Sequence, residues 1–196
     1  RSDLLVGNGS LLSGRASADQ AIRLGGEVGF DRLGARTIIV AGGASLPDLP
    51  APVPEPFIVP ETGSRVVGDH LRVEGDLHVP RNAVLTGNLV VTGKVAMGPG
   101  AHLVGSLKAH QEIELGDGAR IDGAVVSRTT VTSAFRVAMG GPVVAEQEIR
   151  LGPGNTVGLQ HRPTSLAARR IELGIGTTIH GLITASEGGV TTKLPE

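Results

Sequence analysis

The sequence predicts an all-β fold, a parallel β-helix (solenoid) built from 18-residue coils with three six-residue sides. Two apolar columns with a period of six, and glycines with a period of eighteen, predict this architecture. Each hexad matches a short strand with two inward residues, because alternate residues of a strand face opposite sides. One coil cannot bury its own inner face, so we expect the coils to be stabilised by stacking.

The two apolar columns define the expected strands. The first column comprises Leu71, Leu77, Ala83, Leu89, Val95, Ala101, Leu107, Ile113, Ala119, Val125, Val131, Val137, Val143 and Ile149, and it breaks at Asn155. The second lies two residues further on, at Val73, Val79, Leu85, Val91, Met97, Leu103, Ala109, Leu115 and Ile121. A period of six matches no 3.6-residue stripe, and glycine costs about 1 kcal/mol in a helix interior. We therefore expect almost no helix and roughly seven or eight coils.

Two glycine columns mark the corners between the sides. One comprises Gly87, Gly105, Gly123 and Gly141, and the other includes Gly100, Gly118 and Gly154, each ending a Gly-x-Gly turn. Glycine adopts positive φ without a steric penalty from Cβ, so stacked tight turns accumulate stacked glycines. These glycines are geometric requirements of the fold and do not indicate a catalytic site.

The chain divides into three segments. Residues 1–45 repeat the coil pattern, with Ile22 eighteen residues after Leu4, and are either a small cap or part of the same solenoid. Residues 46–64 are rich in proline, which fixes φ and removes donors, so we expect a linker or an external strap. Residues 65–196 form the main β-helix, with an insertion near 158–170 because Ile171 follows Ile149 by 22 residues.

Composition excludes several functional classes. With 18 basic and 19 acidic residues, the chain lacks the positive field that non-specific nucleic-acid binding requires. No cysteine is present, and no apolar run approaches the ~20 residues that cross a bilayer. The six histidines do not align at multiples of eighteen, so we expect no catalytic site, no metal site and no cofactor.

The ends of the solenoid are the expected functional sites. End coils expose unpaired strand edges and an apolar cross-section, which either carry a cap or bind another end. The expected polymerisation interface comprises Leu4, Leu5, Val6, Leu182, Ile183, Val190 and Leu194. The alternative is that residues 187–196 fold over the last coil as a cap. A second expected site is the basic stretch Arg162, Arg169 and Arg170, either a solvated loop or a docking point for an acidic partner or anionic lipid headgroups.

The stretch from Leu71 to Ser127 resembles the bactofilin domain, a bacterial cytoskeletal module. The resemblance rests on the phrases Val73-Glu-Gly-Asp-Leu-His-Val79 and Gly118-Ala-Arg-Ile-Asp-Gly-Ala-Val125, and it covers residues 66–145 well. It implies a right-handed β-helix and a structural scaffold, not an enzyme, which joins end to end into nonpolar filaments without nucleotide. It also implies a cytoplasmic location, often at the inner face of the membrane, where the scaffold positions cell-wall or morphogenetic proteins. A targeting segment before Arg1 would change that location.

Two other classes remain open. A hexapeptide-repeat acyltransferase forms a trimeric left-handed β-helix, but its aliphatic residues are typically followed by small ones. Here the next residue is often long and polar, as at Arg72, Lys108 and Arg120. A β-helical adhesin of a cell surface or phage fibre predicts an aromatic strip for sugar stacking, and Phe30, Phe57 and Phe135 do not form one in the sequence.

Overall fold

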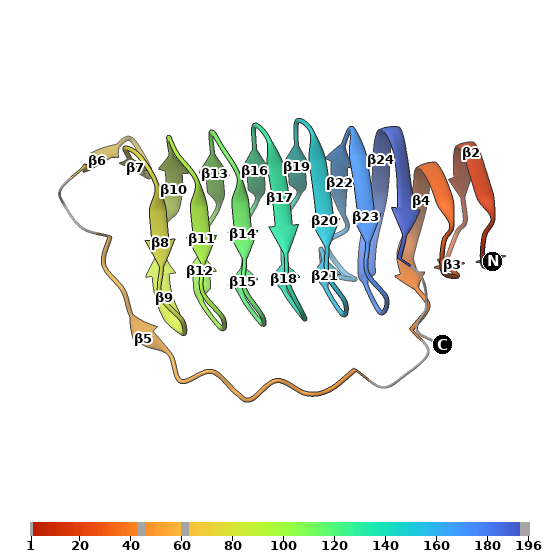
Figure 1. The fold of residues 1–196 in the computed structure, drawn as a ribbon, viewed down its shortest axis with the longest axis horizontal. Coiled ribbons are helices and arrows are strands. Elements are labelled where there is room, and N and C mark those ends of the chain that lie inside the picture. The colour runs from red at the N-terminus through yellow and green to blue at the C-terminus, as the bar shows by residue number, and fades with distance from the viewer. Residues whose placement is uncertain (1, 43–45, 60–62, 193–196) are drawn as a thin grey trace.

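The computed structural model describes residues 2–42, 46–59 and 63–192, and over these ranges the chain is all β. It forms a parallel solenoid of about ten turns (Figure 1). The stack is longer than the seven or eight coils expected, because residues from the N-terminal segment continue it. No helix that could span a membrane occurs in the described part of the chain.

The main solenoid consists of three columns of parallel strands, and each strand pairs with the strand three further along the chain. The first column contains β7 (His70–Val73), β10 (Asn88–Val91), β13 (Leu107–Ala109), β16 (Val125–Ser127), β19 (Val143–Ala145) and β22 (Thr164–Ala168). The second contains β8 (Leu77–Val79), β11 (Val95–Met97), β14 (Ile113–Leu115), β17 (Thr130–Ser133), β20 (Glu148–Leu151) and β23 (Arg170–Leu173). The third contains β9 (Ala83–Thr86), β12 (His102–Val104), β15 (Arg120–Ile121), β18 (Ala138–Met139) and β21 (Thr156–Val157).

The register between coils is eighteen residues, as the periodicity predicts. Leu71 lies opposite Leu89, and Leu89 lies opposite Leu107. All members of the two predicted apolar columns are buried except Leu71, which is partly buried against the core. Aliphatic side chains of successive coils therefore stack into one continuous core, which stabilises neighbouring coils by removing apolar surface from water.

The corner glycines meet two different requirements. Gly100, Gly118 and Gly154 have φ of 68°, 64° and 70°, so their column needs the left-handed conformation. Gly141 does not have positive φ, but a Cβ there would lie 2.6 Å from the carbonyl carbon of Gly123. At Gly141 the limiting factor is therefore the close approach of one coil's backbone to the next, whereas Gly87 of the same column has a φ of 109°.

One coil is longer than the others. Ile149 pairs with Ile171, an offset of 22, and the extra residues loop out between β21 and β22. Beyond this loop, β24 (Thr178–Thr191) is the longest strand and pairs with β21, β22 and β23 in turn. It therefore forms the last coil of the main solenoid.

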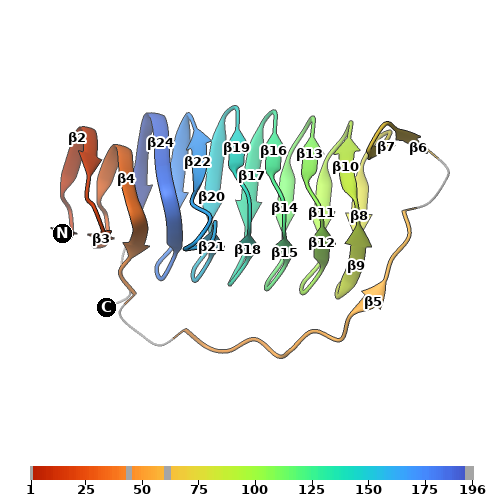
Figure 2. The same ribbon diagram turned by 180° about the vertical axis from the view of Figure 1, so that it is seen from behind.

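The N-terminal segment stacks on that last coil. It contains β1 (Leu4–Val6), β2 (Leu11–Ser17), β3 (Ala21–Leu24) and β4 (Gly29–Val40), with β1 paired to β3 and β2 to β4 in parallel. β4 then pairs with β24 in antiparallel sense, with Ile38 opposite Ile179 and Leu33 opposite Ile183. Dark-blue β24 and orange β4, from opposite ends of the chain, accordingly lie side by side in Figures 1 and 2. We call residues 2–42 the N-terminal module.

A strap leads from the N-terminal module back along the outside of the solenoid to its far end (Figure 2). We call the described residues 46–59 the strap. Most of it lies in no ladder, and only β5 (Glu55–Pro56) pairs, in parallel with β9. The chain then forms β6 (Ser64–Val67), which pairs in antiparallel sense with β7. A path of this kind suits proline, which has no amide N–H to donate to a strand.

Candidate functional site

Within the described residues, one end of the stack is the first coil of the N-terminal module. Among the described residues, β1 pairs only with β3, and β2 pairs only with β4. The outward edges of β1 and β2 therefore present unpaired backbone groups, which are a ready template for another strand. Leu4 and Leu12 sit at the border of the core and are only partly buried.

The other end is the first coil of the main solenoid, which β5 and β6 cover in part. β6 flanks β7, and β5 flanks β9, whereas β8 pairs only with β11 within the described part of the chain. Val59 is buried and Phe57 is partly buried there, so the strap closes part of the apolar cross-section. A hollow lined by Phe57, Ile58 and Val66 remains open.

The most exposed large apolar side chains lie at these two ends. Leu11 is 75% and Leu5 is 73% exposed at the N-terminal module, and Ile58 is 87% and Val66 is 78% exposed at the far end. Every other large apolar side chain in the described residues is less exposed, and Val53 of the strap follows at 70%. Exposed apolar side chains gathered at unpaired strand edges mark surfaces suited to a partner.

The structure divides the interface residues expected from the sequence. Leu4, Leu5 and Val6 lie on β1 at an end of the stack, with Leu5 exposed and Val6 buried. Leu182, Ile183 and Val190 lie on β24, inside the stack, because β4 occupies the edge that we expected to be free. Leu194 lies outside the described residues. The alternative cap, residues 187–196, is described only to 192, and its Gly189 and Val190 lie opposite Phe30 and Gly29 of β4.

Ile58 and Val66, which lie at the second end of the stack, were not predicted from the sequence. Their neighbours supply a signal, since Phe57-Ile-Val59 is a compact apolar run inside a proline-rich segment. Pattern alone did not show that this run returns to cover the first coil of the main solenoid.

The three arginines expected to form a docking loop do not gather. Arg162 lies in the loop between β21 and β22, Arg169 precedes β23 and approaches Glu187 at 3.7 Å, and Arg170 begins β23. All three side chains belong to exposed residues. Arg162 extends toward the backbone of Asp122 and Gly140 on earlier coils.

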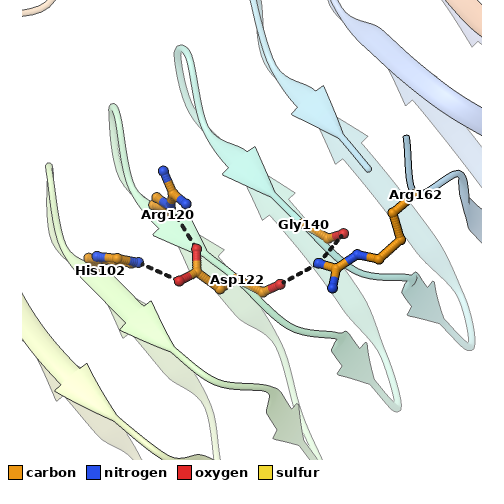
Figure 3. Close-up of polar contacts among 5 residues, drawn as sticks. All are labelled: His102, Arg120, Asp122, Gly140 and Arg162. Carbon is orange, nitrogen blue, oxygen red and sulfur yellow. Dashed lines mark hydrogen bonds and ion pairs between the residues drawn. The ribbon is translucent and has the colours of Figure 1, made fainter. Parts of the chain in front are cut away.

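A polar cluster lies under that loop, on the third strand column (Figure 3). His102 and Arg120 are directly opposite each other on β12 and β15, and Asp122 bridges them. Its Oδ2 is 3.0 Å from His102 Nε2, and its Oδ1 accepts a hydrogen bond of 2.7 Å from Arg120 Nε. Burial alone would raise the pKa of Asp122, but the hydrogen bonds from Arg120 and His102 outweigh it, so the pKa is lowered.

Arg162 closes the other side of this cluster. Its guanidinium points toward the carbonyl oxygens of Asp122 and Gly140, each 3.5 Å away, so both contacts are weak (Figure 3). The loop thereby roofs a small cavity of about 180 Å³ whose floor includes Ala138 and Met139. Both carboxylate oxygens of Asp122 contact a side chain, one of Arg120 and the other of His102 on the preceding coil. The cluster therefore links two neighbouring coils.

In residues 2–42, 46–59 and 63–192, no group of three or more His, Cys, Asp or Glu side chains is placed to hold a metal ion. Comparison with known proteins adds no assignment, because no family model, no curated protein and no solved structure matches the chain. The molecule is thus defined as a parallel β-solenoid, and its two apolar ends are the candidate functional surfaces.

Proposed function

We propose that the chain is a structural scaffold that assembles end to end, without nucleotide, into nonpolar filaments. In this proposal the solenoid is the right-handed, bactofilin-like kind with three six-residue sides, located in the bacterial cytoplasm or at the inner face of the membrane. Its filaments position partner proteins, such as morphogenetic or cell-wall proteins. The single observation that carries the proposal is the placement of Leu5 and Leu11 at one end and Ile58 and Val66 at the other.

The chemistry of the ends supports assembly through them. An unpaired strand edge beside an apolar side chain combines backbone hydrogen bonds with removal of apolar surface from water. β1 and β2 supply that combination at one end. At the other end, β8 pairs only with β11 among the described residues, and Val66 and Ile58 are exposed.

The junction inside the chain supports the nonpolar arrangement. β4 and β24 join two stacks of coils in antiparallel sense, with Leu33 opposite Ile183. A twofold axis between two copies requires the same antiparallel sense, because like ends then face each other. Joining of like ends, N-terminal module to N-terminal module and far end to far end, gives a filament without polarity.

Charged substitutions at one end test both the assembly and its symmetry. Leu5→Glu with Leu11→Glu places like charges opposite each other at a twofold joint, while both side chains are exposed enough to leave the fold intact. If assembly is nonpolar, this variant stops at dimers of twice 20.0 kDa, joined through the far end. If it is polar, the variant stops at monomers. Val53→Glu, on the strap, is the matched control and still assembles.

Sedimentation velocity without nucleotide or metal reads out these states. The proposal expects large polymers for the unaltered chain, dimers for Leu5→Glu with Leu11→Glu, and dimers for Ile58→Glu with Val66→Glu. All four substitutions together yield monomers. An unaltered chain that stays monomeric would overturn the proposal. A discrete trimer of the unaltered chain would favour the hexapeptide-repeat enzyme instead.

A further inference from the structure

The N-terminal module is joined to the rest of the protein in two separable ways. One is covalent, through the chain that leaves β4 at Val40 and returns at the far end of the stack. The other is the noncovalent junction of β4 with β24. The parallel pairing of the solenoid changes to antiparallel pairing at this junction, so it needs no chain connection between the two strands.

The junction has the character of a protein core. Phe30, Leu33 and Ile183 are buried in it, and Thr191 Oγ1 accepts a hydrogen bond from Val28 N at 2.9 Å. The same hydroxyl donates to Gly25 O at 2.7 Å. These contacts are complete whichever copy of the chain supplies the module, which is the condition for exchange of an element between copies.

The strap is held near the far end by the pairing of β5 with β9, and at its start by Arg136. Arg136 Nη1 lies 3.0 Å from Asp48 Oδ1, and its Nη2 donates to Leu46 O at 2.6 Å. Asp48 is 95% exposed, so its ion pair adds little stability. Leu46 also packs over Gly154, where a Cβ would come within 2.9 Å of its Cδ1.

Arg136 occupies a position where the neighbouring coils have glycine. It falls in the column of Gly100, Gly118 and Gly154, and its φ is 52°, in the left-handed region. A side chain other than glycine is strained there, by roughly 1–2 kcal/mol per residue. The backbone at this position would accept glycine more readily. The arginine is therefore explained by its contacts with the strap and not by the conformation of the turn.

We infer that the N-terminal module is exchangeable, and that the surface it covers on β24 also takes the N-terminal module of a second copy. Arg136 acts as the latch that favours the module's own chain, because a strap held against the solenoid keeps the module near its own β24. Loosening the strap lowers that local concentration and favours docking on a second copy. This exchange is independent of assembly through the open ends.

Single cysteines in this cysteine-free chain distinguish the two docking states. Arg32 and Thr184 lie directly opposite each other on β4 and β24, and neither side chain belongs to a buried residue. Opposed antiparallel residues have Cα atoms about 4.5–5.5 Å apart, which a disulfide spans. A chain carrying Arg32→Cys is mixed with a chain carrying Thr184→Cys, oxidised mildly, and analysed on a non-reducing gel. A heterodimer forms in register only when one chain's module docks on the other chain.

The matched control pairs Arg32→Cys with Arg150→Cys, an exposed position on β20 away from the junction. We expect heterodimer above this control, and at least about fivefold more of it when both chains carry Arg136→Gly. Asp48→Ala, at an exposed side chain that cannot unfold the solenoid, raises the yield by less. A yield no higher than the control, or one unchanged by both strap variants, overturns the inference. The disulfide reports only on β4 and β24, so failure of end-to-end assembly is a separate result.

Discussion

Leu33 of β4 lies opposite Ile183 of β24 in an antiparallel pair, and both side chains are fully buried. The residue expected to mark a free C-terminal end thus lies in the interior of the molecule. The two ends of the stack are consequently the first coil of the N-terminal module and the strap-covered coil at β7. The proposed assembly and the proposed exchange both depend on this position of β24 inside the stack.

Thr191→Val tests the hydrogen bonding across the junction. Valine matches the size of threonine but leaves Val28 N and Gly25 O without their partner in a buried setting. Each buried group left unsatisfied costs about 1–3 kcal/mol, so the two together predict a loss of roughly 2–6 kcal/mol in the free energy of unfolding. Urea unfolding measures it, with Thr192→Val, at a less buried neighbour, as the control. Equal midpoints for the two variants would show that the hydroxyl does not hold the junction.

Gly141→Ala tests the close approach of coils at a corner. A Cβ there would lie 2.6–2.8 Å from backbone atoms of Gly123 and Ala124, which have no flexible side chain to move aside. Overpacking of this kind destabilises by about 1–3 kcal/mol. Gly7→Ala is the control, because nothing lies within 4 Å of a Cβ at that position. Thermal melting should separate the two variants, and identical melting temperatures would mean that the coils can move apart freely.

Asp122 contributes a pH-dependent part of the stability. Its pKa is lowered in the folded protein, so the unfolded chain binds a proton first as the pH falls. The contribution is fully present above the ordinary aspartate pKa of 3.8 and is lost as the pH falls through the lower pKa of the folded protein. At neutral pH we expect the unaltered chain to have a higher melting temperature than the Asp122→Asn variant. The difference between the two melting temperatures should disappear in acid. A gap that stays constant down to about pH 2 would contradict this assignment.

The parallel solenoid was predictable because its cause is local. Each coil needs two inward residues per hexad and a corner that accepts glycine, and columns such as those of Leu71 and Gly100 express both. The break in the first apolar column at Asn155 was also visible in the sequence, although the role of Asn155 was not. The buried Asn155 side chain accepts a hydrogen bond of 2.7 Å from Val137 N and donates one to Ser133 Oγ. These hydrogen bonds satisfy polar groups inside the core.

The destination of the N-terminal module was not predictable in the same way. The eighteen-residue spacing of Leu4 and Ile22 predicts that they stack on each other, and they do. It does not say which end of the main solenoid receives them, since both ends offer an apolar cross-section. That choice depends on the length of the strap and on the pairing of β4 with β24, which are long-range properties. Arg136 was overlooked because its role requires the strap to lie across it.

Electron microscopy of the purified chain in negative stain, at moderate salt and without nucleotide or metal, tests the central claim most directly. The proposal predicts long, smooth filaments for the unaltered chain and for Val53→Glu. It predicts only short particles, two molecules long, for Leu5→Glu with Leu11→Glu. Filaments of equal length in that variant would remove the N-terminal module from the interface, and discrete three-lobed particles of the unaltered chain would contradict a filament-forming scaffold.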